Sequence, residues 1–327
     1  EKKKAPVVFR KIYKDLPKGM EWSMSMREFF KQLDFSLPEI IKVQSAEDQT
    51  HKFLLKLKGK HRSPETVEAV AIPFFKKPTI CLSTQIGCKV KCTFCFTGQQ
   101  GFAGNLSTAE IVGQYLVVHQ WLKNNCDAKT PPPNIVFMGQ GEPLHNFEEL
   151  KKTIDILIDP MGPSLSPRQI TVSTAGYLPG IDRFPELQGV NFALSLHSPF
   201  QDQRSEIMPL NRQYPLEKIL PSIRQIPLKR KQYYVIEYLL LKDFNDSAKH
   251  AEALIDLFTD WPVVFNLISF NPYPGSQFLR PEASSVEQFK RILVMAGVPT
   301  MIRTSKGQNI LAACGQLNTK NLAISPM

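Results

Sequence analysis

Long apolar runs are absent from this sequence of 327 residues. No segment approaches the roughly 18–20 consecutive apolar residues that cross a bilayer, which excludes a chain that spans a membrane through helices. No apolar core with a cleavage site follows the polar start, Glu1-Lys2-Lys3-Lys4, so we expect no secretory signal, no membrane partner and a cytoplasmic location. Since the first residue is not Met, we also expect that part of the natural N-terminus is missing.

Cysteine is scarce, and its distribution is uneven. The chain contains six cysteines, and Cys81, Cys88, Cys92 and Cys95 lie close together. Without a sign of export, this grouping disfavours a disulfide scaffold and favours metal or redox chemistry. Cys126 begins a proline-rich stretch that we expect to be a loop, and it matches no motif.

Acidic residues are outnumbered by basic ones. The 40 lysines and arginines exceed the 30 aspartates and glutamates, which gives a formal net charge of +10. Lysine and arginine gain affinity for phosphates by displacing counterions, so the excess favours a polyanionic partner. Many basic proteins bind no nucleic acid, however, and net charge says nothing about the fold. The hydrophobic content of 43% is ordinary for a globular protein and is enough for a sizeable core.

Short apolar runs and amphipathic stretches alternate from about residue 79 onward. We expect strands at Thr79–Thr84, Ile135–Met138, Gln169–Ser173, Val190–Ser195, Tyr233–Leu241 and Val263–Ser269. We expect helices at Ser107–Lys123, Phe147–Ile158, Leu216–Ile226, Ser247–Phe258 and Ser284–Ala296. This alternation predicts an α/β fold with a parallel sheet and right-handed crossovers, either a doubly wound sheet or a partial (β/α)6 barrel.

The N-terminal part follows another pattern. Trp22–Leu33 is a plausible short helix, and Lys52–Leu57 and Thr66–Ile72 alternate as strands do. A basic turn, residues 58–64, separates those two strands. We therefore predict a small N-terminal accessory domain, residues 1–60, followed by the main domain, residues 61–327.

Reactive side chains come directly after the expected strands. Cys88–Cys95 follows the first strand, Gly139–Pro143 follows the second, and Ser173-Thr174 ends the third. Ser195–His197 ends the fourth strand, and Asn271–Tyr273 follows the sixth. In parallel α/β folds, chemistry collects at the C-terminal ends of the strands. Five such ends suit the mouth of a partial (β/α)6 TIM-like barrel best.

Cys88, Cys92 and Cys95 have the spacing C-x3-C-x2-C. Three thiolates can hold three irons of a cubane cluster and leave the fourth iron open for a substrate ligand. The alternative is a structural zinc site, which needs four ligands and often consists of two C-x2-C pairs. A second pair is absent, so the spacing favours an iron–sulfur cluster.

The chemistry of Gly141 and Glu142 suggests a ligand-binding site. A glycine permits close approach of the backbone, and a carboxylate is a natural acceptor for a ligand ammonium group. The alternative is an ordinary turn at a strand end with a solvated glutamate. Taken singly, Ser173, Ser195 and His197 would more often be turn residues or hydrogen-bonded polar groups of the core.

Several segments together resemble the radical S-adenosylmethionine (SAM) superfamily and, within it, the RlmN/Cfr family of RNA adenine methyltransferases. The segments that carry the resemblance are Cys81–Cys88, Cys92–Cys95, Gly101-Phe102, Met138–Leu144, Val172–Gly176, Ser195–His197 and Ala312–Leu317. The last segment is the most specific. The resemblance extends from about Ile40 to Leu317, and so many motifs with consistent spacing make an accident improbable.

The resemblance implies the cofactors, the partners and their sites. A radical SAM methyltransferase domain would hold a [4Fe–4S] cluster on Cys88, Cys92 and Cys95. The residues expected to bind S-adenosyl-L-methionine are Gly141, Glu142, Ser173, Ser195, Leu196, His197 and Asn271. The accessory domain would bind RNA. The partners would be 23S rRNA, tRNA and an electron donor such as flavodoxin.

The same resemblance implies a pair of catalytic thiols. Cys314 would first accept a methyl group as a thiolate nucleophile, and a C-terminal loop would carry it. A carbon radical would then add to the adenine ring, because the carbon attacked is electron-poor and resists an ordinary methyl donor. Cys81 would release the joined RNA by forming a transient disulfide with Cys314, and Glu68 would accept the proton. By itself, Glu68 reads as a solvent-facing strand residue. We expect residues 306–317 to move.

Two questions stay open at this point. Asn309, Leu311 and Gly104 stand where the family usually has other residues, which puts the pose of the loop and the RNA contacts in doubt. The closer relatives methylate carbon 2 of the rRNA adenosine, and many also modify certain tRNAs, but carbon 8 methylation is an alternative within the family. An alternative from another class is a zinc-stabilised RNA-binding protein without catalysis. Such a protein would not need Glu142, Cys314 and Cys81 together, so their joint presence favours the enzyme.

Overall fold

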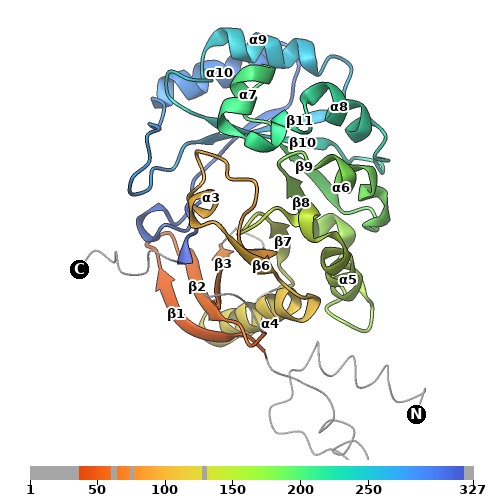
Figure 1. The fold of residues 1–327 in the computed structure, drawn as a ribbon, viewed down its shortest axis with the longest axis vertical. Helices are drawn as coiled ribbons and strands as arrows, with labels where there is room; N and C mark the ends of the chain where they lie inside the picture. Colours follow the sequence, from red (N-terminus) through yellow and green to blue (C-terminus); the bar gives the residue numbers. More distant parts are fainter. Residues whose placement is uncertain (1–36, 60–64, 74–76, 127–130, 320–327) are drawn as a thin grey trace, which may run out of the picture.

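The computed structural model describes residues 37–59, 65–73, 77–126 and 131–319 (Figure 1). The expected helix Trp22–Leu33 and most of the predicted accessory domain lie outside the described residues, as does most of the basic turn at 58–64. No helix within the described ranges is long and apolar enough to cross a membrane.

One large sheet forms the centre of the described chain (Figure 1). Its strands, in spatial order, are β1 (Glu39–Ser45), β2 (His51–Lys56), β3 (Thr66–Ile72), β4 (Thr79–Cys81), β7 (Asn134–Phe137), β8 (Ile170–Thr174), β9 (Asn191–Ser195), β10 (Tyr234–Leu240), β11 (Val263–Ser269) and β12 (Thr300–Arg303). The pairs from β1 to β4 are antiparallel, and every pair from β4 to β12 is parallel. The sheet is therefore an open parallel barrel wall with an antiparallel extension.

The predicted α/β barrel fold is confirmed. Each of the six expected strands is present, although the first ends early, at Cys81. A seventh parallel strand, β12, was not expected, because four residues are too short to show a periodic pattern. The strands β1 and β2 belong to the same hydrogen-bonded sheet as the barrel, so this part of residues 1–60 packs as an extension of it. The domain boundary itself stays a prediction.

Helices cover the outer side of the barrel wall (Figure 1). The five expected helices are α4 (Thr108–Asn125), α5 (Phe147–Ile158), α8 (Leu216–Arg224), α9 (Ala248–Leu257) and α10 (Ala283–Met295). Ser107 begins α4 with a capping box, because its hydroxyl accepts from the Glu110 backbone N–H while the Glu110 carboxylate accepts from the Ser107 N–H. The strands between the helices are nearly continuous apolar runs, as in β10, where only Val235 is not buried.

A small hairpin and three short helices lie at the C-terminal ends of the strands. The hairpin pairs β5 (Gln85–Gly87) with β6 (Phe102–Asn105), and the helices are α3 (Phe96–Gln100), α6 (Leu178–Asp182) and α7 (Gln201–Ile207). Gly87 has a φ of +72°, and a Cβ there would lie 1.6 Å from the Gly101 carbonyl oxygen. Only glycine fits, so the hairpin closes tightly around the cysteine loop, residues 88–95.

A fully buried arginine on α7 ties neighbouring strand ends together. Arg204 donates from Nε to the Leu196 carbonyl at 2.9 Å, and from Nη2 to the carbonyls of Ala175 at 2.7 Å and Ser195 at 3.0 Å. Its Nη1 donates to the side chain of Asn211. No carboxylate in the described part of the chain pairs with it, so these carbonyl oxygens compensate its charge.

We predict that Arg204→Met lowers the free energy of unfolding by roughly 2–4 kcal/mol, because several buried carbonyl groups lose their donor. Urea unfolding followed by circular dichroism measures this change. The matched control is Arg291→Met on the exposed face of α10, which should alter stability by less than about 0.5 kcal/mol. An Arg204→Met variant as stable as the control would show that the hydrogen bonds of Arg204 contribute little to the free energy of unfolding.

Candidate active site

The cysteine loop begins where β5 ends. The Cys88 N–H donates to the Gly101 carbonyl at 3.0 Å, and the Cys95 N–H donates to the Cys92 carbonyl at 3.1 Å, which turns the loop back on itself. The Thr93 N–H donates to the Ile207 carbonyl at 3.0 Å and anchors the loop to α7. As a result, all three expected ligands, Cys88, Cys92 and Cys95, line one cavity of about 160 Å³.

The arrangement of these thiols can be compared with the two metal sites considered above. Within the described ranges, no three His, Cys, Asp or Glu side chains converge on one point that a single metal ion could occupy. A structural zinc site needs four ligands, and the cysteine loop brings three thiols to the cavity. Three thiolates of a cubane bind separate irons, so three thiols that line one cavity fit the cluster.

Burial makes the uncompensated thiolates unfavourable. It raises the pKa of Cys88 to about 12, and it raises the pKa of Cys92 and Cys95 as well, with the neighbouring thiols adding to the effect for Cys92. A cationic iron centre would remove this penalty, because thiolates are the metal-binding form of cysteine. The donor set therefore fits an iron–sulfur cluster.

Most of the residues expected to bind the cofactor lie around the same cavity. Gly141, Glu142, Ser173, Ser195, His197 and Cys314 line it. Leu196 does not, since its side chain is fully buried in the core and its carbonyl accepts from Arg204. Asn271 lies beside a smaller adjoining cavity. The assignment of Leu196 and Asn271 to the cofactor stays a prediction.

Glu142 is held in a fixed pose after β7, where it precedes a short 3-10 helix, Pro143–Asn146. Its Oε2 accepts from the Ala175 N–H at 2.8 Å, and its Oε1 accepts from the Leu144 N–H at 3.1 Å. Burial raises the pKa of Glu142 to about 7, although these two N–H bonds favour the charged form. Gly141, at a φ of +104°, packs so closely that a Cβ would lie 2.6 Å from the Cβ of Gln85. The carboxylate is thus preorganised to accept a ligand cation.

His197 presents a neutral imidazole to the cavity. Its Nδ1 accepts from the Leu239 N–H at 3.0 Å, which leaves the proton of the neutral ring on Nε2. Burial, together with the nearby charge of Arg204, lowers the pKa of His197 to about 3. Ser173 and Ser195 end adjacent strands, with their hydroxyl oxygens 3.4 Å apart. These three side chains supply neutral hydrogen-bonding groups.

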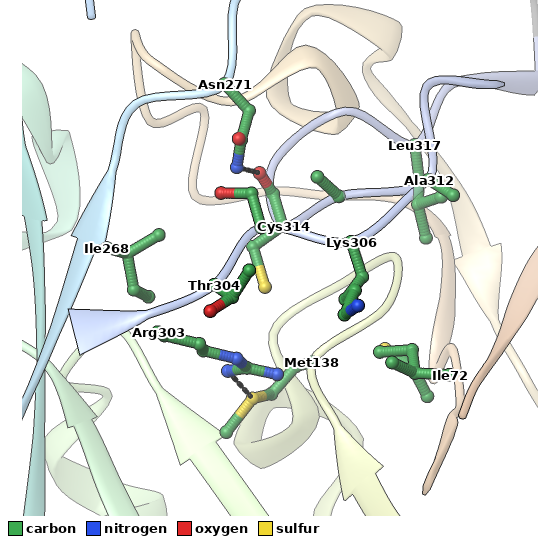
Figure 2. A pocket seen from close by; sticks show the side chains of 13 residues that line it. Ile72, Met138, Ile268, Asn271, Arg303, Thr304, Lys306, Ala312, Cys314 and Leu317 are labelled. Carbon is green, nitrogen blue, oxygen red and sulfur yellow. Dashed lines mark hydrogen bonds between the residues drawn. The ribbon is translucent and has the colours of Figure 1, made fainter. Parts of the chain in front are cut away.

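The two expected catalytic thiols both line the smaller cavity, of about 40 Å³. Figure 2 shows Cys314 there. Cys314 lines both cavities, whereas Cys81 lines only the smaller one. Burial raises the pKa of Cys81 to about 12, and the proximity of Cys314 contributes to the rise. The Asn271 amide donates to the Cys314 carbonyl at 3.5 Å and holds the loop in place. All six cysteines are free thiols, so the transient disulfide stays a prediction.

Glu68 is buried and lines neither cavity. The interpretation of Glu68 as a solvent-facing strand residue, which its position in the sequence suggests, is therefore wrong. Its Oε1 lies 3.1 Å from Lys52 Nζ, and its Oε2 accepts from the Asn318 N–H at 2.8 Å. Lys52 Nζ also donates to the Leu311 carbonyl at 3.3 Å. Burial raises the pKa of Glu68, and the Lys52 charge opposes that rise. The carboxylate therefore joins β3 to the C-terminal loop.

The positions that depart from the family pattern are spread around this loop and the hairpin. Gly104 pairs with Ile86 in the hairpin. Asn309 lies in a short 3-10 turn, Gln308–Ile310, and Leu311 has a φ of +52°. Cys126 is exposed, with its Sγ 3.8 Å from His51 Nε2, and lines neither cavity. These positions contribute no side chain to either cavity.

Two residues of the site were missed from sequence. Glu237 and Arg303 both line the larger cavity, with Arg303 Nη1 3.9 Å from Glu237 Oε2. A signal for Glu237 exists, since it is the one charged residue in the apolar run Tyr234–Leu240. Arg303 ends a strand too short to be predicted, so no local pattern indicates its place.

Comparison with known proteins agrees with this geometry. The family model described as "Radical SAM superfamily" matches residues 82–255. The chain is 39% identical over 329 residues to the dual-specificity RNA methyltransferase RlmN of a Nitratiruptor species, a match that covers 96% of this chain and 91% of that protein. It is 40% identical to the RlmN of Nautilia profundicola, over 94% of this chain and 87% of that protein.

A solved structure supports the same relationship. The crystal structure of a radical SAM methyltransferase from Sphaerobacter thermophilus matches with a TM-score of 0.89 and 33% identity, and it covers 97% of this chain and 93% of that chain. The resemblance inferred from the motifs is therefore confirmed along nearly the whole sequence. This chain belongs to the radical SAM superfamily and, within it, to the RlmN family of RNA methyltransferases.

Proposed function

We propose that this chain methylates carbon 2 of an adenosine in 23S rRNA, and of an adenosine in certain tRNAs, through an S-methylcysteine at Cys314. One observation carries the proposal: Cys314 stands at the junction of the cavity of the cysteine loop and the cavity that contains Cys81. A thiol there can take a methyl group on one side and meet a resolving thiol on the other. The relatives' description as dual-specificity RNA methyltransferases supports both RNA substrates.

Membership of the superfamily implies S-adenosylmethionine and an iron–sulfur cluster. Cys88, Cys92 and Cys95 would bind three irons of a [4Fe–4S] cluster within the larger cavity. When bound, the cluster supplies one electron, and S-adenosylmethionine supplies the methyl group and the radical that activates it. An external one-electron donor, such as a flavodoxin, would restore the electron.

The surrounding side chains would bind and orient the cofactor. Glu142 would accept its ammonium group, because the carboxylate is already held by two backbone N–H groups. His197 would donate from Nε2, and the hydroxyls of Ser173 and Ser195 would bond further polar groups. Asn271 would act chiefly through its hydrogen bond to the Cys314 carbonyl.

The release of product would use Cys81. Its thiolate would attack Cys314 Sγ to form the disulfide, and the bond from that sulfur to the methylene carbon would break. The electron pair would go to that carbon, which would take a proton to become the methyl group of the RNA. Glu68 would accept the proton that the adenine ring loses, as the family resemblance implies. Because Glu68 is bonded to Lys52 and Asn318 in this conformation, the C-terminal loop must move before Glu68 can do so.

The RNA would be bound through its phosphates and through one exposed base. The excess of ten positive charges favours a polyanion, and the affinity should fall with rising salt. The target adenosine must leave its stack to reach a buried cavity. With ribosomal and transfer RNA as substrates, the enzyme would act in the cytoplasm.

The nucleoside product tests the proposal directly. Cluster-loaded protein should convert an adenosine of a 23S rRNA fragment into 2-methyladenosine, identified by mass and retention time against 2-methyl and 8-methyl standards. Cys314→Ala should yield neither product, because no residue accepts the methyl group. Cys81→Ala should keep S-methylcysteine at Cys314 and accumulate a covalent protein–RNA species. Detection of 8-methyladenosine would overturn the regiochemistry, and product formation by Cys314→Ala would overturn the mechanism.

Cluster assembly is a separate prediction. Replacing Cys88, Cys92 or Cys95 with Ala should abolish bound iron and sulfide after anaerobic reconstitution, because each thiolate holds one iron. Formation of 5′-deoxyadenosine should be lost as well. Cys126→Ala is the matched control and should retain full iron content, since Cys126 lines neither cavity. A cysteine-loop variant that still cleaves the cofactor fully would refute the ligand set.

The binding of S-adenosylmethionine should depend on pH through Glu142. The pKa of this carboxyl is about 7, and only the charged form attracts an ammonium group, so affinity should fall as pH drops below about 7. Well below that value, the loss should approach about tenfold per pH unit, measured by calorimetric titration of the cluster-loaded protein. Glu142→Gln should weaken binding and flatten the profile, whereas exposed Glu148→Gln should leave both unchanged.

A further inference from the structure

The C-terminal loop packs against one face of the antiparallel extension of the sheet. Lys52 of β2, Val70 of β3 and Cys81 of β4 are paired across these strands, so their side chains share that face. Val70 and Cys81 pack there against Ala312 and Leu317 of the loop. Figure 1 shows the C-terminal segment, in dark blue, next to β2. Much of this contact is therefore apolar.

One buried ion pair lies within the contact. Glu68 precedes Val70 by two residues on β3, so it lies on the same face, diagonally opposite Lys52. The Lys52 Nζ and Glu68 Oε1 atoms are 3.1 Å apart, and the two side chains are only 8% and 1% exposed. A buried ion pair is favourable only when further hydrogen bonds satisfy its remaining polar positions.

The C-terminal loop and the residue after it supply those hydrogen bonds. Lys52 Nζ donates to the Leu311 carbonyl at 3.3 Å, and the Asn318 N–H donates to Glu68 Oε2 at 2.8 Å. Leu311 precedes Cys314 and Asn318 follows it. The ion pair therefore holds the segment that carries Cys314 at a point on either side of the thiol.

The backbone of Glu68 is fixed independently of the loop. Its N–H donates to the Gln140 side chain at 3.1 Å, and its carbonyl accepts from the Ser83 hydroxyl at 2.6 Å. Both partners belong to the ends of barrel strands, so β3 stays in place when the loop moves. The loop can leave only by giving up its bonds to Lys52 and to Glu68.

We propose that Lys52 is a positioning residue, which together with Glu68 holds the C-terminal loop so that Cys314 lies beside the cysteine loop. The inference rests on the proposed function, in which Cys314 accepts a methyl group and Glu68 later accepts a proton. While the loop is held, both oxygens of Glu68 are occupied, and the carboxylate can act as a base only after the loop has left. Methyl acceptance and proton removal thus belong to different positions of the loop. The role of Lys52 adds no covalent or redox step.

Hydrogen exchange of backbone amides measures whether Lys52 holds the loop. In cluster-loaded protein, Lys52→Met should make the amides of residues 306–318 exchange about tenfold faster, because the Leu311 carbonyl loses its donor and Glu68 loses its counter-charge. The matched control is Lys56→Met, at the exposed end of the same strand, which should leave this exchange unchanged.

A double variant covers the case in which an unpaired charge on Glu68 unfolds the protein. Lys52→Met combined with Glu68→Gln removes both charges from the buried site and keeps the shape of the carboxyl side chain. If Lys52→Met alone does not fold, the double variant takes its place in the comparison with wild type. If both single variants fold, the double variant should exchange no faster than the faster of them, because the two residues act as one pair. Effects that multiply would overturn the pairing.

The methylation of Cys314 tests the positioning role itself. Unmethylated protein, reconstituted with the cluster, is given saturating S-adenosylmethionine, and peptide mass spectrometry follows S-methylcysteine at Cys314. The double variant should form it about tenfold more slowly, because a displaced nucleophile reacts more slowly. Its affinity for S-adenosylmethionine, measured by calorimetry, should be unchanged, since neither Lys52 nor Glu68 lines either cavity.

Faster exchange of the loop together with slower methylation of Cys314 supports the inference. Unchanged exchange in Lys52→Met overturns it, and so does an equal increase in Lys56→Met. Faster exchange with a normal rate of methylation also overturns it, because the ion pair would then not position Cys314. Absence of S-methylcysteine in the wild-type protein would overturn the proposed function instead, while the exchange experiment would still show whether Lys52 holds the loop.

Discussion

The active site depends on hydrogen bonds between the helix after the cysteine loop and the end of the described chain. The Phe96 N–H donates to the Gly315 carbonyl at 2.7 Å, and the Thr97 hydroxyl donates to the Leu317 carbonyl at 2.6 Å, across 220 residues of sequence. They hold the C-terminal loop where Cys314 lines the cavity of the cysteine loop. These bonds, together with the one from Asn271 to the Cys314 carbonyl, fix the position of the loop beside the cysteines.

The same loop is tied on its other side to the antiparallel extension of the sheet. Lys52 bonds both the Glu68 carboxylate and the Leu311 carbonyl, and Glu68 also accepts from the Asn318 N–H. Movement of Cys314 toward Cys81 would strain these bonds together, because they converge on one buried carboxylate. A buried carboxylate that loses its partners becomes a stronger base, so under the proposed function movement of the loop would be coupled to proton abstraction by Glu68.

Local spacing explains why so much of the site could be predicted. The three cysteines lie within one short loop, and Glu142 lies in the segment that follows β7, so their order along the chain indicates the same edge of the sheet. Leu196 is a residue of the motif whose side chain the sequence could not place. It stands between two residues that face the cavity, but consecutive side chains at a strand end point to opposite sides, and its own enters the core.

The sequence by itself predicted the α/β fold, because apolar periodicity is a local property, and its motifs identified the family and with it the class of reaction. The spacing of the cysteines is local as well, so it could indicate which thiols would hold a cluster. Only the tertiary structure decided that Arg303 faces Cys314, and that Lys52 neutralises Glu68. These residues lie on strands or loops far apart in the chain. Which strand ends meet depends on the closure of the barrel and on the docking of the C-terminal loop, and neither leaves a pattern in the neighbouring residues.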